Sequence, residues 1–216
     1  DNIYLFDKDD STPLWTYDPS GNNDVNAVAI SADGEYIVAG NNGDMVYFFD
    51  KDSSTPLWSS FLSDVTSVSI SADGEYIIVG TEGNKIYLLD KDSSTPLWSD
   101  SIGSSSSVDI SADGNYIVAG TFVNTVHLYD RDSSTPLWSD SLANEVYSVS
   151  ISSNGEYIAV GCRDNKLYVY HKDSNTPLWS YEADDDILSV SISADGEYIV
   201  AGASGGDDRV YFFSKD

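Results

Sequence analysis

The sequence of 216 residues contains one cysteine, Cys162, one methionine, Met45, and two histidines. A single cysteine excludes an internal disulfide and any zinc or iron–sulfur site built on several cysteines. No apolar run approaches the roughly 20 residues that span a bilayer, so we expect no membrane insertion. Because the only methionine lies inside the chain, we expect a protein that has been processed or excised from a longer one.

Positive charge is scarce as well, because 10 Lys and Arg face 36 Asp and Glu, for a net charge of −26. The resulting field repels nucleic-acid phosphates and anionic lipid surfaces, which excludes nucleic acid as a partner. A surface crowded with aspartate is typical of a high-salt or cell-surface setting, or it keeps a Ser-, Tyr- and Trp-rich β protein soluble. The composition favours an extracellular or cell-surface location, which the sequence alone leaves open.

An internal repeat is the main feature of the sequence. Five tryptophans, Trp15, Trp58, Trp98, Trp138 and Trp179, follow one another at intervals of 43, 40, 40 and 41 residues. Each closes a near-constant segment such as DKDSSTPLW, and some fifteen residues later comes SADGEY or a close variant. A period of about 40 residues indicates a solenoid or a propeller. We expect residues 1–216 to form one domain.

Four short strands and no helix are predicted within each repeat, for which the second copy is the example. Residues 65–70 alternate apolar and small polar side chains, as a half-buried strand does. Gly74 supplies the positive φ of the hairpin turn that follows. Further strands are predicted at 75–79 and 85–89, then a turn at 90–95 and an edge strand that opens at Pro96. Four short strands and no helix within about 40 residues predict a β-propeller blade.

The motifs resemble two families of propeller repeats. Residues 65–90 resemble a WD-repeat unit, whose third strand ends in aspartate, although Leu-Asp, Phe-Asp or Tyr-Asp replaces Trp-Asp and the Gly-His pair is absent. DKDSSTPLW resembles the quinoprotein repeat, whose tryptophan docks between blades, with serine in place of the turn glycine. The resemblance covers the whole chain and implies a propeller of an archaeal or bacterial surface type, a fold that hosts enzymes, receptors and scaffolds alike.

Enzyme chemistry is not expected. The quinoprotein resemblance would imply a quinone cofactor only with a metal-binding constellation and a paired cysteine, so we expect no cofactor. His127 stands where the other copies have tyrosine, which predicts a packing role, and His171 replaces the aspartate that ends the third strand. A base without a nucleophile partner is not a catalytic site. Cys162 is expected to be a small core residue.

Strand counting predicts how the ring closes. The first, second and fourth strands occur five times, whereas the third occurs six times. We expect an all-β, five-bladed β-propeller of four-stranded antiparallel blades. Residues 13–17 would supply the outer strand of the blade built on residues 187–214, which removes the open edges. One copy of the third strand, at residues 2–7 or at residues 209–214, is then surplus. A surplus copy would also be present in a segment cut from a ring of six to eight blades.

The loops that differ between copies define a candidate binding face. In a four-stranded meander the second-to-third and fourth-to-first connections emerge on the same side, where a rigid scaffold displays binding residues. Neutral drift in unconstrained loops is the alternative. The candidate residues are Asn42, Asp44, Asp64, Glu82, Asn84, Phe122, Asn124, Glu145, Arg163, Asp164, Asp184, Asp185, Asp207 and Asp208. We expect this acidic face to bind a protein or a small cationic partner; the alternatives are a purely structural repeat module and a quinoprotein-like enzyme.

The recurrent Asp-x-Asp-Ser-Ser-Thr turn, as at Asp50 and Asp52, carries carboxylates at alternate positions, which suits Ca²⁺. The turn lacks both a sharp-turn glycine and a later bidentate acid. Asp, Ser and Thr also cap turns by bonding to their own backbone. We therefore expect capping and no metal at these turns.

Overall fold

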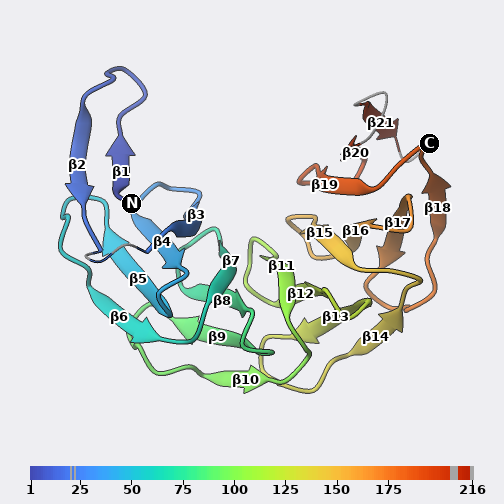
Figure 1. Cartoon of the computed structure of the whole chain (residues 1–216), viewed down its shortest axis with the longest axis horizontal. Coiled ribbons are helices and arrows are strands. Elements are labelled where there is room, and N and C mark those ends of the chain that lie inside the picture. Colours follow the sequence, from blue (N-terminus) through green and yellow to red (C-terminus); the bar gives the residue numbers. More distant parts are fainter. Residues whose placement is uncertain (20, 22, 205–208, 215–216) are drawn as a thin grey trace.

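The strands of the computed structural model form antiparallel sheets that follow one another along an open arc (Figure 1). The structure describes residues 1–19, 21, 23–204 and 209–214. Among these residues there is no helix long and apolar enough to cross a membrane. The all-β class and the succession of repeated sheets are confirmed.

Four complete sheets occupy the middle of the arc, each with its strands in sequence order. The first contains β3 (Val25–Ile30), β4 (Tyr36–Asn41), β5 (Met45–Asp50) and β6 (Trp58–Phe61). The second contains β7 (Val65–Ile70), β8 (Tyr76–Thr81), β9 (Ile86–Asp90) and β10 (Trp98–Asp100). The third contains β11 (Ser105–Ile110), β12 (Tyr116–Thr121), β13 (Thr125–Asp130) and β14 (Trp138–Ser141). The fourth contains β15 (Val146–Ile151), β16 (Tyr157–Cys162), β17 (Lys166–His171) and β18 (Trp179–Glu182).

Two smaller sheets stand at the ends of the arc. At the N-terminal end β1 (Ile3–Phe6) pairs with β2 (Pro13–Tyr17). At the C-terminal end β19 (Ile187–Ile192), β20 (Tyr198–Ala203) and β21 (Val210–Ser214) form a three-stranded sheet. The predicted strands are present, including the sixth copy of the third strand. The outer strand of the second complete sheet begins at Trp98 rather than at the predicted Pro96.

The predicted closed ring of five blades is wrong. Residues 13–17 do form a strand, but they pair with β1, with Ile3 opposite Tyr17 and Leu5 opposite Trp15. Among the described residues β21 pairs with β20 alone, so there are six sheets and the two ends of the arc are separate. The reason is local, because β1 and β2 are joined by a short loop whose closure costs far less entropy than pairing strands nearly 200 residues apart.

In the five sheets that follow β2 the first hairpin is fixed by a serine–aspartate turn, with Asn154 in place of the aspartate in the fourth complete sheet. The Ser71 hydroxyl donates to the Asp73 carboxylate at 2.6 Å and accepts from the Tyr76 amide at 3.0 Å. Gly74 takes a φ of 73°, which side chains with a Cβ resist. The predicted turn is confirmed, and it recurs because the serine and the glycine recur at the same spacing, with aspartate or asparagine between them.

Neighbouring sheets are held together on their outer side by the recurring tryptophan. The indole Nε1 of Trp98 donates to the Arg131 carbonyl of the next sheet at 2.6 Å, and its ring packs on Tyr129 with centroids 5.5 Å apart. The same bond runs from Trp15 to Lys51, from Trp58 to Lys91 and from Trp138 to Lys172. The predicted docking of tryptophan between sheets is confirmed.

On their inner side the sheets are joined by serine. The first strand of each sheet is an edge whose outward amides would otherwise lack a partner. The amide of Val108 donates to the Ser67 hydroxyl of the preceding sheet at 3.2 Å. Val149 and Val190 make the same bond to Ser107 and Ser148. The small polar residues of the alternating pattern therefore pair neighbouring sheets.

The hydrophobic core is divided into layers between the sheets. Val38, Val46 and Phe48 of the first sheet pack against Val65 and Val68 of the second. Similar clusters lie between the later sheets. Each sheet is therefore apolar on both faces, and it depends on a neighbour at each face to bury them.

The tryptophan docking predicts a large cost for Trp98→Ala. We expect a loss of about 3–5 kcal/mol in the free energy of unfolding, because a large aromatic side chain leaves an interface and the Arg131 carbonyl loses its donor. Trp98→Phe should cost much less, since the ring contact with Tyr129 is retained. The measurement is urea unfolding followed by circular dichroism. Leu97→Ala, at a half-exposed neighbour, is the control, and an equal loss in both variants would contradict the docking role.

Candidate functional site

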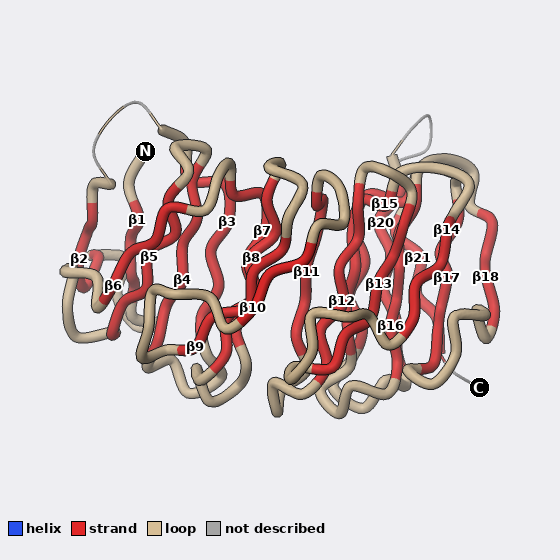
Figure 2. The backbone as a smooth tube through the Cα atoms, turned by 90° about the horizontal axis from the view of Figure 1, so that it is seen from below, coloured by secondary structure: helices blue, strands red, loops and turns tan. Residues whose placement is uncertain are grey.

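The loops predicted to share one face do lie together. In Figure 2 the connections emerge along two opposite edges of the row of strands. Backbone hydrogen bonds join the loop between the second and third strands of a sheet to the loop that precedes the first strand of the same sheet. The Glu82 amide donates to the Asp64 carbonyl at 2.9 Å, and the Arg163 amide donates to the Glu145 carbonyl at 2.9 Å. The two sets of variable loops thus form one continuous loop face.

Some of the predicted site residues have a backbone role. Asp44, Asn84 and Asn124 take φ values of 67°, 65° and 70°, and Asn165 takes the same conformation in the fourth sheet. Asn and Asp tolerate this left-handed conformation better than other residues with a side chain. Their recurrence just before the third strand of each complete sheet is therefore explained by the turn, whatever else they contact.

The exposed residues of the loop face are spread along the arc. The exposed predicted residues are Asn42, Glu82, Asn84, Phe122, Arg163 and Asp184. The partly buried ones are Asp44, Asp64, Asn124, Glu145, Asp164 and Asp185. Asp207 and Asp208 lie outside the described residues. The structure brings these residues to one side of the sheets without gathering them into a single pocket.

Arg163 is the centre of a charged cluster on the loop face. Its guanidinium lies 2.7 Å from the Glu145 carboxylate and 3.8 Å from that of Asp186, which belongs to the next sheet. Asp186 was not among the predicted residues, although it directly follows two that were. Asp164 is engaged within its own loop, where it accepts from the Tyr168 hydroxyl at 2.6 Å.

Asp109 is a carboxylate that sequence reasoning passed over. It lies in β11, where the neighbouring first strands carry Ser69 and Ser150. One carboxylate oxygen accepts from the Ser69 hydroxyl at 2.8 Å and the other from the Ile151 amide at 2.9 Å, so Asp109 links three sheets. Burial raises the pKa of Asp109, although these hydrogen bonds oppose the rise. The sequence did contain a signal for this residue, because Asp109 replaces the serine that is repeated at this position of the first strand.

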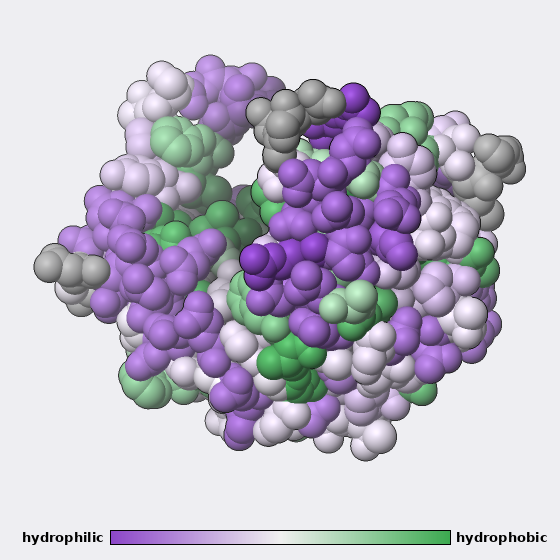
Figure 3. Space-filling model, turned by 45° about the vertical axis from the view of Figure 1, so that its right-hand side comes forward, coloured by the Kyte–Doolittle hydropathy of each residue, from purple (hydrophilic) through white to green (hydrophobic). Residues whose placement is uncertain are grey.

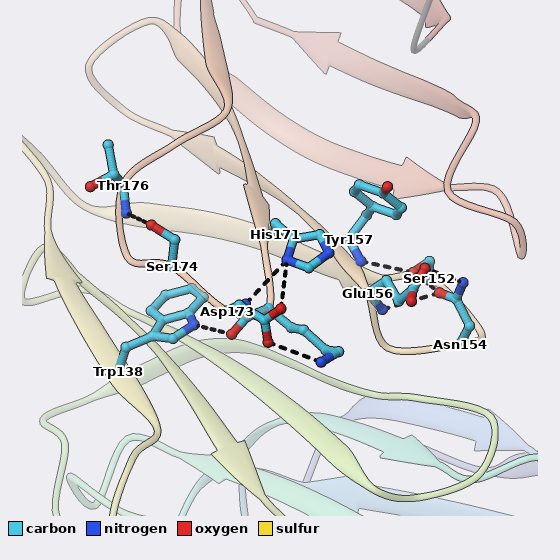
Figure 4. A network of polar contacts seen from close by, with 10 residues as sticks. Trp138, Ser152, Asn154, Glu156, Tyr157, His171, Asp173, Ser174 and Thr176 are labelled. Atoms are coloured by element: carbon cyan, nitrogen blue, oxygen red, sulfur yellow. Dashed lines mark hydrogen bonds and ion pairs between the residues drawn. The ribbon is translucent and has the colours of Figure 1, made fainter.

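The two histidines serve the packing and the turns. His127 contacts the hydroxyls of Ser139 and Thr125 at 2.7 and 2.9 Å, and burial lowers its pKa. His171 accepts from the Asp173 amide at 3.3 Å and lies edge-on against Tyr157 (Figure 4). His127 also packs beside Tyr129, with ring centroids 6.1 Å apart, as its predicted packing role requires. The expectation that the histidines have no hydroxyl partner is wrong for His127, because of its contact with Ser139.

Cys162 is buried, and burial raises the pKa of its thiol to about 12. A thiol with so high a pKa is a poor nucleophile at neutral pH, because the thiolate is the reactive form. The predicted role as a small core residue is confirmed.

The Asp-x-Asp turns are capped by their own side chains, as predicted. The Asp90 carboxylate accepts from the Asp92 amide at 2.9 Å, and the Ser93 hydroxyl accepts from the Thr95 amide at 3.0 Å. Asp50 and Asp130 make the same bond to their own turns. Over the described part of the chain, no three His, Cys, Asp or Glu side chains are placed to hold a metal ion.

The repeats and the docking tryptophans define a quinoprotein-like β-propeller. The family model described as outer membrane protein assembly factor BamB matches residues 1–124 and again residues 123–216, and the chain belongs to this family. A search of the curated proteins found no match. The quinoprotein-like resemblance drawn from the repeat motifs is therefore confirmed.

The burial of Asp109 predicts a pH-dependent stability difference between the protein and Asp109→Ser, which restores the repeated serine. The pKa of Asp109 is higher in the folded than in the unfolded state, so the folded state gains relative stability as the pH falls through the folded pKa, and loses it as the pH rises. We expect the free energy of unfolding of the variant, taken relative to that of the wild type, to rise between pH 4 and pH 8. Urea unfolding at both pH values measures this, and an unchanged difference would contradict it.

Proposed function

We propose that this protein is a non-enzymatic binding scaffold whose loop face receives a basic segment of a protein partner. The observation that carries the proposal is a contrast between the two sides of the sheets. The turns of the opposite side repeat almost unchanged, whereas the residues of the loop face differ from copy to copy. A scaffold that keeps its framework and varies one set of loops is typical of a binding surface.

Charge supports a cationic partner. The net charge of −26 attracts positively charged molecules over the whole surface and speeds their association. On the loop face Asp64 and Glu82 lie together through their backbone hydrogen bond, and neither takes part in an ion pair among the described residues. They are therefore well placed to contact Lys or Arg of a partner.

The family supports a protein partner rather than a substrate. The family is that of an outer membrane protein assembly factor, a protein that acts on other proteins. The one histidine–hydroxyl pair described above, His127 with Ser139, has no carboxylate to orient the ring, since its other nitrogen contacts the Thr125 hydroxyl. A purely structural module is the remaining alternative, and it predicts no specific partner for the loop face.

The test is the binding of a fluorescent Lys- and Arg-rich peptide, measured by anisotropy at low and at physiological salt. We expect Asp64→Lys combined with Glu82→Lys to weaken binding by about fivefold or more, with the effect shrinking as salt screens the charges. Asp92→Lys combined with Asp132→Lys is the matched control, since it makes the same change in net charge at the turns of the opposite side.

Equal weakening by the two pairs of substitutions would show that the peptide responds only to the net charge, and the loop-face proposal would fail. Absence of binding by any basic peptide would favour the structural module.

A further inference from the structure

A small pocket lies between the second and third complete sheets, at the turns opposite the loop face. It has a volume of about 260 Å³ and is lined by Tyr76, Leu97, Trp98, Arg131 and Asp132. Both sheets that form it have all four of their strands. Much of the surface shown in Figure 3 is hydrophilic, with apolar side chains exposed in small patches, whereas this pocket combines two aromatic rings and a leucine with a cation. We call it the Arg131 pocket.

The cation of this pocket lacks the glutamate that its equivalents use. In the second sheet Lys91, which follows the third strand, pairs with the Glu75 carboxylate, and the first sheet has the same pair. In the third sheet Arg131 and Asn115 occupy these two positions. The backbone relation is unchanged, because the Arg131 amide donates to the Asn115 carbonyl at 2.9 Å and the Lys91 amide donates to the Glu75 carbonyl at 3.0 Å. The Glu75 carboxylate therefore has no counterpart beside Arg131.

Asn115 does not replace the glutamate as a partner of the cation. Its side-chain amide donates to the Asp113 carboxylate at 2.6 Å. Among the described residues the one ion pair of Arg131 is with Asp132, whose Oδ1 lies 3.3 Å from the guanidinium Nε. The Asp132 side chain is 82% exposed, so water screens this pair. The terminal nitrogens of Arg131 are therefore available to donate to a further acceptor.

An aromatic ring orients the guanidinium. The Cζ of Arg131 lies 4.5 Å from the centroid of the Tyr76 ring. An arginine that stacks on an aromatic ring keeps its N–H donors in the guanidinium plane, where they match the two oxygens of a carboxylate. This fit to two oxygens distinguishes Arg131 from the lysine of the other sheets, whose ammonium is a point charge.

The remaining walls of the pocket are apolar. Leu97 is 50% exposed, and the partly buried ring of Trp98 stands beside it. The indole N–H of Trp98 already donates to the Arg131 carbonyl, so Trp98 offers a ligand its ring rather than a hydrogen bond. The pocket therefore places a cation for a carboxylate next to apolar surface for a small aliphatic group.

We propose that the Arg131 pocket binds a carboxylate that carries one aliphatic group about the size of a leucine side chain. The two carboxylate oxygens accept from Arg131, in the role that the glutamate has in the second sheet. The aliphatic group covers Leu97 and the ring of Trp98. This chemistry occurs at the C-terminus of a peptide that ends in an aliphatic residue, and in a free branched-chain acid.

The test is a titration of the whole chain with isocaproate, followed by NMR of the indole N–H groups. Physiological salt screens the repulsion between this anion and the net charge of −26. The Trp98 indole is the reporter, because it donates to the Arg131 carbonyl. We expect a saturable shift of its signal with a Kd of about 1 mM, as one charged contact and a small apolar group allow. The signals of Trp58 and Trp138, at the equivalent interfaces, should move much less. Isocaproamide, the neutral amide, should not bind.

Two of the variants use residues that other repeats contain at the same position. Asn115→Glu supplies the glutamate of the second sheet, which would pair with Arg131 and should weaken binding by about tenfold or more. Asn42→Glu is the matched control on the loop face, where the second sheet has Glu82, and it should leave the affinity unchanged. Asp132→Asn should tighten binding by about twofold or more, because it removes a charge of the same sign as the ligand.

Four results would each overturn the proposal: no saturable shift of the Trp98 signal, equal shifts with the acid and the amide, equal affinities of Asn115→Glu and Asn42→Glu, or weaker binding by Asp132→Asn. N-acetyl-leucine separates the two sources of the carboxylate. Tighter binding than that of isocaproate assigns the pocket to a peptide C-terminus, and equal or weaker binding assigns it to a free acid. The pocket lies opposite the loop face and takes an anion, so this titration and the basic-peptide experiment fail separately.

Discussion

The structure depends on one constraint, which is that each sheet is apolar on both faces and must be covered by a neighbour. Tryptophan makes this contact on the outer side, as from Trp98 to the Arg131 carbonyl, and serine makes it on the inner side, as from Ser67 to the Val108 amide. Repetition of both bonds sets the 40-residue period. A repeat array of this kind gains its stability from nearest-neighbour interfaces, and its last sheets are left with one face uncovered.

That constraint also explains which features the sequence could predict. The strands, the serine–aspartate turn and the tryptophan docking are local or repeat themselves, so five copies confirm one another. Ring closure was predicted wrongly because it concerns a single long-range pairing, and β1 competes with β21 for the same partner, β2. The contacts of Arg163 with two sheets, and of Asp109 with three, depend on the curvature of the arc, which no residue pattern encodes.

The face proposed for binding follows from this framework. The loop face is polar and acidic and belongs to every sheet, so it suits a partner recognised by charge and spread along the arc. Its display on repeated sheets is consistent with a scaffold of the assembly-factor family.

The central claim is that the chain is an open arc whose terminal sheets do not pair. Its most direct test is a distance measurement by electron paramagnetic resonance between spin labels on Thr16→Cys in β2 and Val210→Cys in β21, with the buried Cys162 left unlabelled. Continuous-wave line broadening detects short distances, and double electron–electron resonance measures long ones. The open arc predicts a distance far beyond that of neighbouring strands, whose Cα atoms lie about 5 Å apart. A distribution centred on adjacent-strand separation would contradict the account and restore a closed ring.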